Sequence, residues 1–235
     1  MVRKLAYSVS EREHWISAGG GLIGILAVLW IGHFWIGGHS GMLAIASMGS
    51  SAVLLFASPH GALSQPWPVF GGHIVSALVG VTCARWLGGE PMLAASLAVA
   101  LAIAAMYSLR CLHPPGGATA MYAVLGGETV HALGYGYLFS PVLLNVIVLL
   151  AVAVAFNYPF AWRRYPQSWH RRSQPVADVT EESMIPHRNL VYALSQIDTF
   201  VDVSEEDLQR IYALALTGSP SAQPVLQPGS VFART

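Results

Sequence analysis

The chain has 235 residues, of which 54% are hydrophobic and 10% are charged, and its mean hydropathy is +0.52. A soluble domain carries roughly a quarter charged residues, so this composition excludes an ordinary globular protein and predicts a chain embedded in the bilayer. The formal net charge is zero, which gives a nucleic-acid-binding role no support. Between residues 15 and 161 the charged side chains are Arg85, Glu90, Arg110 and Glu128.

The predicted elements are helices of two lengths. A transmembrane helix needs about 20 mostly apolar residues, and four segments meet this requirement: residues 15–36, 70–87, 91–109 and 139–160. Two shorter apolar segments, residues 42–57 and 117–125, each follow a helix-breaking stretch and end in turn residues. We therefore expect an all-α polytopic bundle of about six segments, with four full spans and two short broken helices.

The order long, short, long occurs twice along the chain, which predicts two inverted three-helix repeats. The small residues at 49–52 in the first short segment match those at 117–120 in the second. Short segments interrupted by glycine or proline at matching places in two halves indicate the binding site of a transporter. We favour six crossings, and four spans with two re-entrant hairpins are the alternative.

Basic residues flank the predicted membrane region on both sides: Arg3, Lys4 and Arg12 before it, and Arg163, Arg164, Arg171 and Arg172 after it. Cytoplasmic loops carry the excess of Lys and Arg, so we expect both termini in the cytoplasm and an even number of crossings. The first apolar stretch lacks the cleavage pattern of a signal peptide and is expected to be a retained span. Together with the absence of a transit peptide, this favours a bacterial inner membrane.

The chain is expected to divide into five parts. They are a cytoplasmic segment (1–14), a transmembrane domain (15–162), a juxtamembrane linker (163–184), a cytoplasmic helical hairpin (185–216) and a disordered tail (217–235). Within the transmembrane domain, Gly72, Ser76, Gly80 and Ala84 recur at intervals of four. Such a stripe lets two helix backbones approach closely, and it could join the two halves or join two subunits of a homodimer.

The chemically most informative stretch is Leu-His-Pro-Pro-Gly-Gly at residues 112–117. Its prolines stop one helix and its glycines allow a turn before another helix begins. Free N–H groups at such a helix start form a natural site for a small anion, to which Arg110 would add charge and Thr119 a hydroxyl. Residues 49–51 would supply a second cluster of amides and hydroxyls. The alternative is a structural kink that packs against its neighbours.

This reasoning predicts a substrate-binding set of nine residues: Ser50, Ser51, His73, Arg110, His113, Gly116, Gly117, Thr119 and Asn145. An ionisable residue within a membrane segment is a functional candidate, so His113 could pass a proton with an anion or sense pH. It could equally cap a backbone carbonyl. His73 and Asn145 could approach the anion or form bonds within the bundle.

Other uses of these side chains have less support. A haem or metal site would draw on His33, His39, His73 and His113, but these are not spaced at i, i+3 or i, i+4 and lack a nearby carboxylate in sequence. We therefore expect no metal and no cofactor. Catalysis is disfavoured because Glu90 and Glu128, the two carboxylates of the apolar region, are expected in loops. Cys83 and Cys111 match neither a disulfide framework nor a metal-ligand spacing and are expected to be buried thiols.

Three ordered motifs resemble those of the HPP family of integral membrane proteins. Residues 112–120 closely resemble the family signature, residues 48–57 look like its first-half motif, and residues 65–73 resemble the next block. The likeness extends from about residue 15 to residue 158 and implies a compact multi-helix membrane domain. Plant relatives are associated with nitrite transport into chloroplasts. The resemblance therefore implies a small-anion cargo, and it supports testing Ser50, Ser51, His113, Gly116, Gly117 and Thr119.

The leading hypothesis is a transporter or channel for a small inorganic anion, with nitrite as the favoured cargo. Its partners would be that anion, the lipid bilayer and a second copy of the chain. The alternative hypothesis is a membrane scaffold or sensor that acts through its cytoplasmic helical tail.

Overall fold

The computed structural model describes residues 11–34 and 45–169 together with Leu208. Its principal helices are α1 (Glu11–Gly32), α2 (Ile45–Ala57), α3 (Pro66–Trp86), α4 (Pro91–Ser108), α5 (Pro114–Leu125), α6 (Gly127–Leu133) and α7 (Leu144–Asn157). Short helical turns η3 (Ala62–Ser64), η4 (Leu138–Leu143) and η5 (Gln167–Trp169) complete the described part. Apart from Leu208, the predicted cytoplasmic hairpin and tail lie outside the described residues.

Among the described residues, four helices are long and apolar enough to cross a membrane: α1, α3, α4 and the continuous segment Leu138–Asn157, which comprises η4 and α7. This confirms the all-α polytopic fold and its four full spans. The two short helices, α2 with 13 residues and α5 with 12, are also confirmed. The last span bends at Ser140, whose φ of −138° and ψ of 115° are not helical, because the residue before a proline is pushed away from the helical region.

Three details differ from the sequence-based expectation. The second helix begins at Ile45, so residues 49–51 lie inside α2 rather than at its start. The helix α5 begins at Pro114 rather than at residue 117, because proline is well tolerated in a first helical turn. Glu128 was expected in a loop but lies in the first turn of α6, where its negative charge suits the helix dipole.

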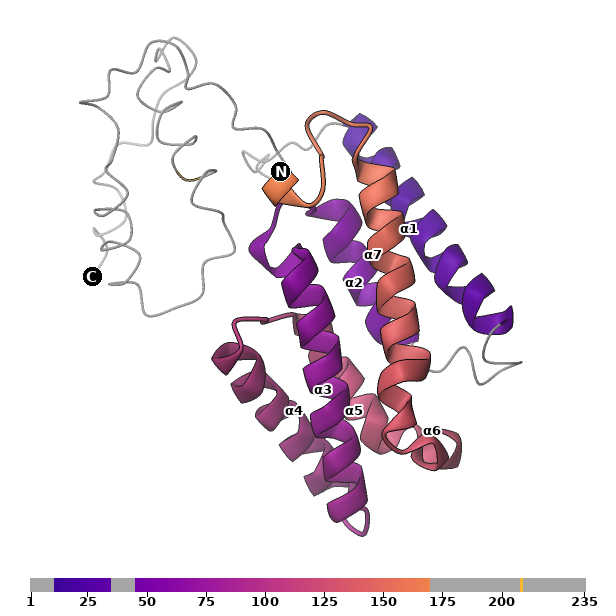
Figure 1. Ribbon diagram of the computed structural model, residues 1–235, viewed down its shortest axis with the longest axis vertical. Coiled ribbons are helices and arrows are strands. Elements are labelled where there is room, and N and C mark those ends of the chain that lie inside the picture. The colour runs from indigo at the N-terminus through magenta and orange to yellow at the C-terminus, as the bar shows by residue number, and fades with distance from the viewer. Residues whose placement is uncertain (1–10, 35–44, 170–207, 209–235) are drawn as a thin grey trace, which may run out of the picture. The chain divides into compact units, whose positions relative to one another are not determined.

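The helices α1 and α4 each bury one ridge of small residues and expose large apolar side chains. In α1 the buried residues recur every four positions: Gly20, Gly24, Val28 and Gly32. A Cβ atom on Gly20 or Gly24 would lie within 2.8 Å of the Phe56 ring. Exposed side chains such as Trp15, Leu22 and Leu101 form the surface expected to face lipid. Figure 1 shows α1 beside α7 and α4 beside α3.

The helices α3 and α5 run parallel and in close contact. A Cβ atom on Gly72 would lie 2.5 Å from the His113 Cβ, and one on Gly80 would lie 2.4 Å from the Ala120 carbonyl oxygen. A Cβ atom on Gly116 would in turn lie 2.7 Å from the Ser76 Oγ. The small-residue stripe therefore serves, at these positions, to join the two halves of one chain.

One end of the domain is held together by the buried guanidinium of Arg163, which is 1% exposed. It pairs with Glu13 on α1, donates to the carbonyl of Phe56 at the end of α2, and donates to the Oδ1 of Asn157 on α7. Burial lowers the pKa of this guanidinium, and the Glu13 carboxylate opposes that fall. The Tyr165 hydroxyl donates to the Ser64 carbonyl at 2.8 Å and so fixes η3 at the same end.

Candidate functional site

Four polar side chains from three helices meet inside the membrane domain. Ser51 comes from α2, His73 from α3 and Thr119 from α5, while His113 is the N-cap of α5. Each of the four is 0% exposed. Polar groups buried in this way need hydrogen-bond partners, because in the membrane interior water does not supply them.

Within this cluster every side chain is hydrogen-bonded to the next. The Ser51 Oγ lies 2.8 Å from the Nε2 of His73 and also 2.8 Å from the Nε2 of His113. The Nδ1 of His73 lies 2.7 Å from the Thr119 Oγ1, and the Nδ1 of His113 lies 2.9 Å from the Leu63 carbonyl oxygen. These contacts form one path from Thr119 to Leu63, which we call the histidine chain. The Ser51 Oγ also lies 3.1 Å from the Ser47 carbonyl oxygen of its own helix.

The local sequence explains how His113 reaches this position. The residue before a proline favours extended backbone, and His113 has a φ of −141° and a ψ of 104°. Pro114 and Pro115 then occupy the first helical turn, where their missing N–H groups cost least. Because Gly72 has no side chain, the His113 Cβ can lie directly against α3. The two imidazole rings come to rest with their centroids 5.0 Å apart.

Asn145 on α7 is a fifth buried polar residue, also 0% exposed. Neither its Nδ2 nor its Oδ1 has a hydrogen-bond partner among the described residues. The helix that carries it packs against both α2 and α3. Most buried side-chain polar atoms are paired, so an unpaired amide in this bundle is the kind of group that a polar ligand would satisfy.

The predicted cradle of helix amides is wrong in its geometry. The first two residues of α5 are prolines, which have no N–H, and the amide of Gly116 donates to the His113 carbonyl at 2.8 Å. In α2, residues 49–51 follow four earlier helical residues, so they do not form a helix start. The polar groups that meet in the interior are side chains instead.

Three of the predicted site residues lie away from the histidine chain. Ser50 is exposed, and its hydroxyl donates to the Ala46 carbonyl of its own helix. Arg110 is exposed in the turn between α4 and α5, where it adopts a φ of 53°. Gly117 is half-buried, and the nearest atom to a Cβ built on it is the Val99 Cγ1 at 3.9 Å. Their assignment to substrate binding stays a prediction.

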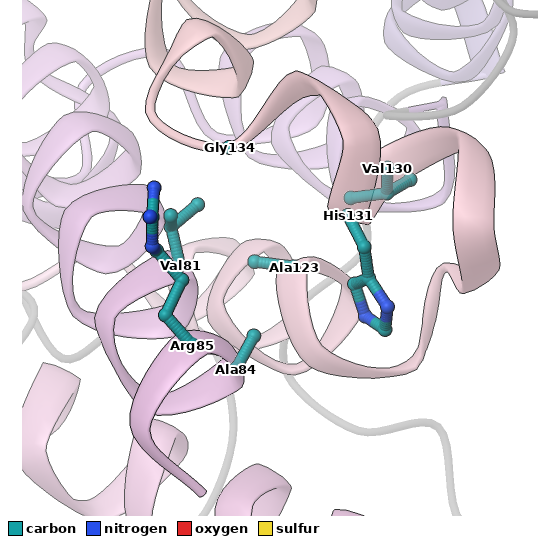
Figure 2. Close-up of a pocket in the computed structure, with 7 residues that line it drawn as sticks. All are labelled: Val81, Ala84, Arg85, Ala123, Val130, His131 and Gly134. Atoms are coloured by element: carbon teal, nitrogen blue, oxygen red, sulfur yellow. The ribbon is translucent and has the colours of Figure 1, made fainter. Parts of the chain in front are cut away.

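A cavity of about 190 Å³ lies at the other end of α3 and α5, closed on one side by α6. Figure 2 shows Arg85 and His131 on opposite sides of it. Ala123 also lines the cavity, and it follows Thr119 by one helical turn on the same face of α5. The rise of an α-helix places the two residues about 6 Å apart along its axis, so the cavity lies about one helical turn from the Thr119 end of the histidine chain.

Comparison with known proteins identifies the family. The model of the transmembrane region of HPP proteins matches residues 6–166. The chain belongs to the HPP family. Two curated transmembrane proteins of Dictyostelium discoideum are similar to it: one is 38% identical over 53% of this chain and 41% of its own length, and the other is 32% identical over 59% and 55%. The chain thus spans about half the length of these relatives. No solved structure matches it.

The three HPP-like motifs of the sequence converge on the histidine chain. Residues 48–57 contribute Ser51, residues 65–73 contribute His73, and residues 112–120 contribute His113 and Thr119. This convergence brings together two histidines that are 40 positions apart. Among the described residues, no group of three or more His, Cys, Asp or Glu side chains is placed to hold a metal ion.

Sequence reasoning missed several parts of this region. The Leu63 carbonyl that ends the histidine chain carries no sequence signal, because every residue has such a group. The buried Tyr137, whose hydroxyl donates to the Thr119 carbonyl at 3.5 Å, was likewise not singled out. Arg85 had a signal, since it is one of only two arginines between positions 15 and 161, a range without lysine.

Proposed function

We propose that this HPP protein carries a small inorganic anion across the membrane, with nitrite as the favoured cargo. The observation that supports this most is the fully buried cluster of Ser51, His73, His113 and Thr119 in an apolar helical bundle. Ionisable and polar residues are costly at such depth and mark the pathways of ions and substrates. The cargo itself is the part of the proposal that the plant relatives of the family suggest.

The chemistry of the cluster suits a small anion. Imidazole N–H, hydroxyl and carboxamide N–H groups all donate hydrogen bonds, and weak neutral donors let an ion leave as well as bind. The unpaired amide of Asn145 would supply one such donor. These side chains replace the helix amides as the proposed anion ligands.

The cavity between α3, α5 and α6 is the proposed way in from one side. The guanidinium of Arg85 stands over the Tyr135 ring at 5.5 Å, which holds it at the wall of the cavity. A fixed positive charge at a narrow entrance raises the local concentration of anions. The path then continues along α5 from Ala123 to Thr119.

The pairing of helices supports the two inverted repeats on which alternating access would depend. In such a repeat, α1, α2 and α3 would be equivalent to α4, α5 and α7. The α1–α2 contact would then correspond to the α4–α5 contact, and the α1–α7 contact to the α4–α3 contact. Both members of each pair are in contact. The α2–α5 contact and the α3–α7 contact would each be their own counterpart in the repeat, and both are present. The buried ridge of α1 also has its counterpart in α4: Ala94, Ala98, Ala102 and Met106.

Nitrite uptake into proteoliposomes tests the proposal with two neighbouring serines of α2. Ser51 belongs to the histidine chain, whereas Ser50 is exposed. Ser51→Ala should lower uptake about tenfold or more, because a lost buried hydrogen bond is worth on the order of 1–3 kcal/mol. Ser50→Ala should leave uptake unchanged. Wild-type vesicles with no nitrite, nitrate, formate or chloride uptake, or equal losses in both variants, would contradict the proposal.

A further inference from the structure

We infer that the histidine chain is a proton-binding site, and that one added proton reverses the direction of three of its four hydrogen bonds. Anion transport would then be coupled to the movement of protons. This use of the proton rests on the proposed function, whereas the proton site itself stands on the geometry of the four side chains.

The direction of the hydrogen bonds is set at the Leu63 end. A carbonyl oxygen only accepts hydrogen bonds, so the Nδ1 of His113, 2.9 Å from the Leu63 oxygen, must carry a hydrogen. In a neutral imidazole the other nitrogen is then an acceptor. The Ser51 Oγ lies 2.8 Å from this acceptor and 3.1 Å from the Ser47 carbonyl oxygen. The hydroxyl of Ser51 must donate to the Nε2 of His113, because two lone pairs would otherwise face each other at the shorter distance.

The remaining contacts follow from the fact that a serine hydroxyl has one hydrogen. Because Ser51 gives that hydrogen to His113, the Nε2 of His73 must donate to the Ser51 Oγ. The Nδ1 of a neutral His73 is then an acceptor, and it receives the hydrogen of the Thr119 hydroxyl. All four donors thus point the same way, from Thr119 toward Leu63, and the two histidines are held in opposite tautomers.

An added proton can enter at the Thr119 end and be passed along. Thr119 takes up the proton and gives its own hydrogen to the Nδ1 of His73. His73 releases its Nε2 hydrogen to Ser51, and Ser51 gives its hydrogen to the Nε2 of His113. Three bonds to hydrogen break and four form, so one proton is gained. The charge ends on His113, which becomes an imidazolium.

The protonated state is also satisfied by contacts already present. The Nε2–H of His113 donates to Ser51, Ser51 donates to the Nε2 of His73, and the Nδ1–H of His73 donates to Thr119. The Thr119 hydroxyl can turn to the Pro115 carbonyl, 3.5 Å away. The Leu63 carbonyl cannot pass a proton onward, so the histidine chain loads and unloads at the Thr119 end, which is also the end nearest the cavity.

The charge of the imidazolium explains why the proton and the anion would bind together. A buried cation is costly without a partner of opposite charge. The carboxylates that the structure describes are Glu11, Glu13, Glu90 and Glu128, and no hydrogen bond found among the described residues joins them to the histidine chain. A bound anion would supply the missing charge, and by linkage each ligand then strengthens the binding of the other.

The titratable groups around the histidine chain are few. Cys111 packs on Gly71 of α3, Tyr137 contacts the Thr119 carbonyl, and Tyr165 contacts Ser64 beside Leu63. His60 lies in the turn before η3. On the remaining sides, α4 presents Met106 and α7 carries Asn145. Within the histidine chain, the groups that can accept the charge are thus the imidazoles of His73 and His113.

Nitrogen NMR of the full chain, labelled at histidine and reconstituted in lipid, tests the proton site directly. Spectra of His73→Gln and His113→Gln assign the two signals. We expect neutral His113 to carry its hydrogen on Nδ1 and neutral His73 on Nε2, and acidification to make His113 an imidazolium while His73 moves its hydrogen to Nδ1. Neutral His113 with an Nε2 hydrogen would overturn the inference. So would a His73 that keeps its Nε2 hydrogen, since Ser51 would then have turned to the Ser47 carbonyl at 3.1 Å.

The coupling is tested by nitrite binding and nitrite uptake at neutral and mildly acid pH. We expect the nitrite affinity to rise about tenfold on acidification, within the usual range of coupling between two sites, and uptake to follow an inward proton gradient. His113→Gln should remove the pH dependence, whereas His33→Gln, a change at an exposed position, should keep it. Uptake with unaltered pH dependence in His113→Gln would refute the coupling but leave the transport proposal. The expected tautomers without any anion uptake would refute the transport proposal but leave the proton-binding site.

Discussion

Gly72 and His113 touch across the α3–α5 interface so closely that a Cβ atom on Gly72 would lie 2.5 Å from the Cβ of His113. Gly72→Ala should therefore push His113 away from Ser51 without removing any polar group. Overpacking of this kind costs about 1–3 kcal/mol. We expect a lower Tm in detergent, together with reduced nitrite uptake. Gly49→Ala is the control, because a Cβ atom there meets nothing within 4 Å.

Adjacent glycines at the start of α5 give a matched pair of variants. A Cβ atom on Gly116 would lie 2.7 Å from the Ser76 Oγ and 2.8 Å from the Gly72 carbonyl oxygen, whereas one on Gly117 meets open space out to 3.9 Å. Gly116→Ala should lower the Tm. Gly117→Ala should raise the free energy of unfolding by about 0.4–1 kcal/mol, because the unfolded chain loses freedom. Equal Tm values for the two variants would contradict the close α3–α5 packing.

Two buried asparagines of α7 differ in a way that can be measured. The amide of Asn157 donates to the carbonyls of Leu55 and Ala153 and accepts from Arg163, whereas the amide of Asn145 is unpaired among the described residues. A buried unpaired polar group costs about 1–3 kcal/mol. Asn145→Val should therefore raise the Tm while lowering nitrite uptake.

Asn157→Val is the counterpart and should lower the Tm, because it leaves the Arg163 guanidinium without one of its acceptors. A fall in Tm for Asn145→Val as well would mean that its amide is paired in the folded protein. Unchanged uptake in Asn145→Val would remove this residue from the proposed anion ligands.

The buried guanidinium of Arg163, which contacts α1, α2 and α7, predicts a large effect of its removal on the free energy of unfolding. Removing one partner of a buried ion pair costs about 3–5 kcal/mol, because the other charge is left uncompensated. Arg163→Ala should therefore destabilise the contacts among α1, α2 and α7, with a strongly lowered Tm. Arg12→Ala is the control, since the exposed Arg12 stands over the Trp162 ring at 5.4 Å and such a contact contributes about 0.5–1 kcal/mol. A similar Tm for both variants would show that Arg163 does not hold these helices together.

The two exposed arginines of the central region predict different salt dependence of transport. Arg85 lines the cavity, whereas Arg110 lies in the turn before α5. Arg85→Gln should lower nitrite uptake at low ionic strength and have less effect at high ionic strength, because salt screens an exposed charge. Arg110→Gln should change uptake less. Initial rates measured across a series of salt concentrations check both expectations, and a larger loss in Arg110→Gln would place the entrance elsewhere.

Much of the fold could be predicted because its cause is local. Long apolar segments cross a bilayer wherever they occur, so the four spans followed from composition and length. The breaks before α2 and α5 followed from glycine and proline, which act on the backbone of their own neighbours. Element ends depend on more than these local signals: α5 starts at Pro114 because a first turn accepts proline, and α6 forms in a stretch whose glycines predict a loop.

Composition and residue order alone establish that this chain is a membrane bundle and that His113 and Thr119 belong to its most unusual stretch. They could not determine that Ser51, 62 positions away, hydrogen-bonds to His113, or that the Leu63 carbonyl orients that histidine. Those relationships depend on how α2, α3 and α5 pack, and packing brings together residues that no spacing along the chain relates. The tertiary structure likewise excluded the cradle of amides, because only the observed hydrogen bonds reveal that Gly116 already donates to His113.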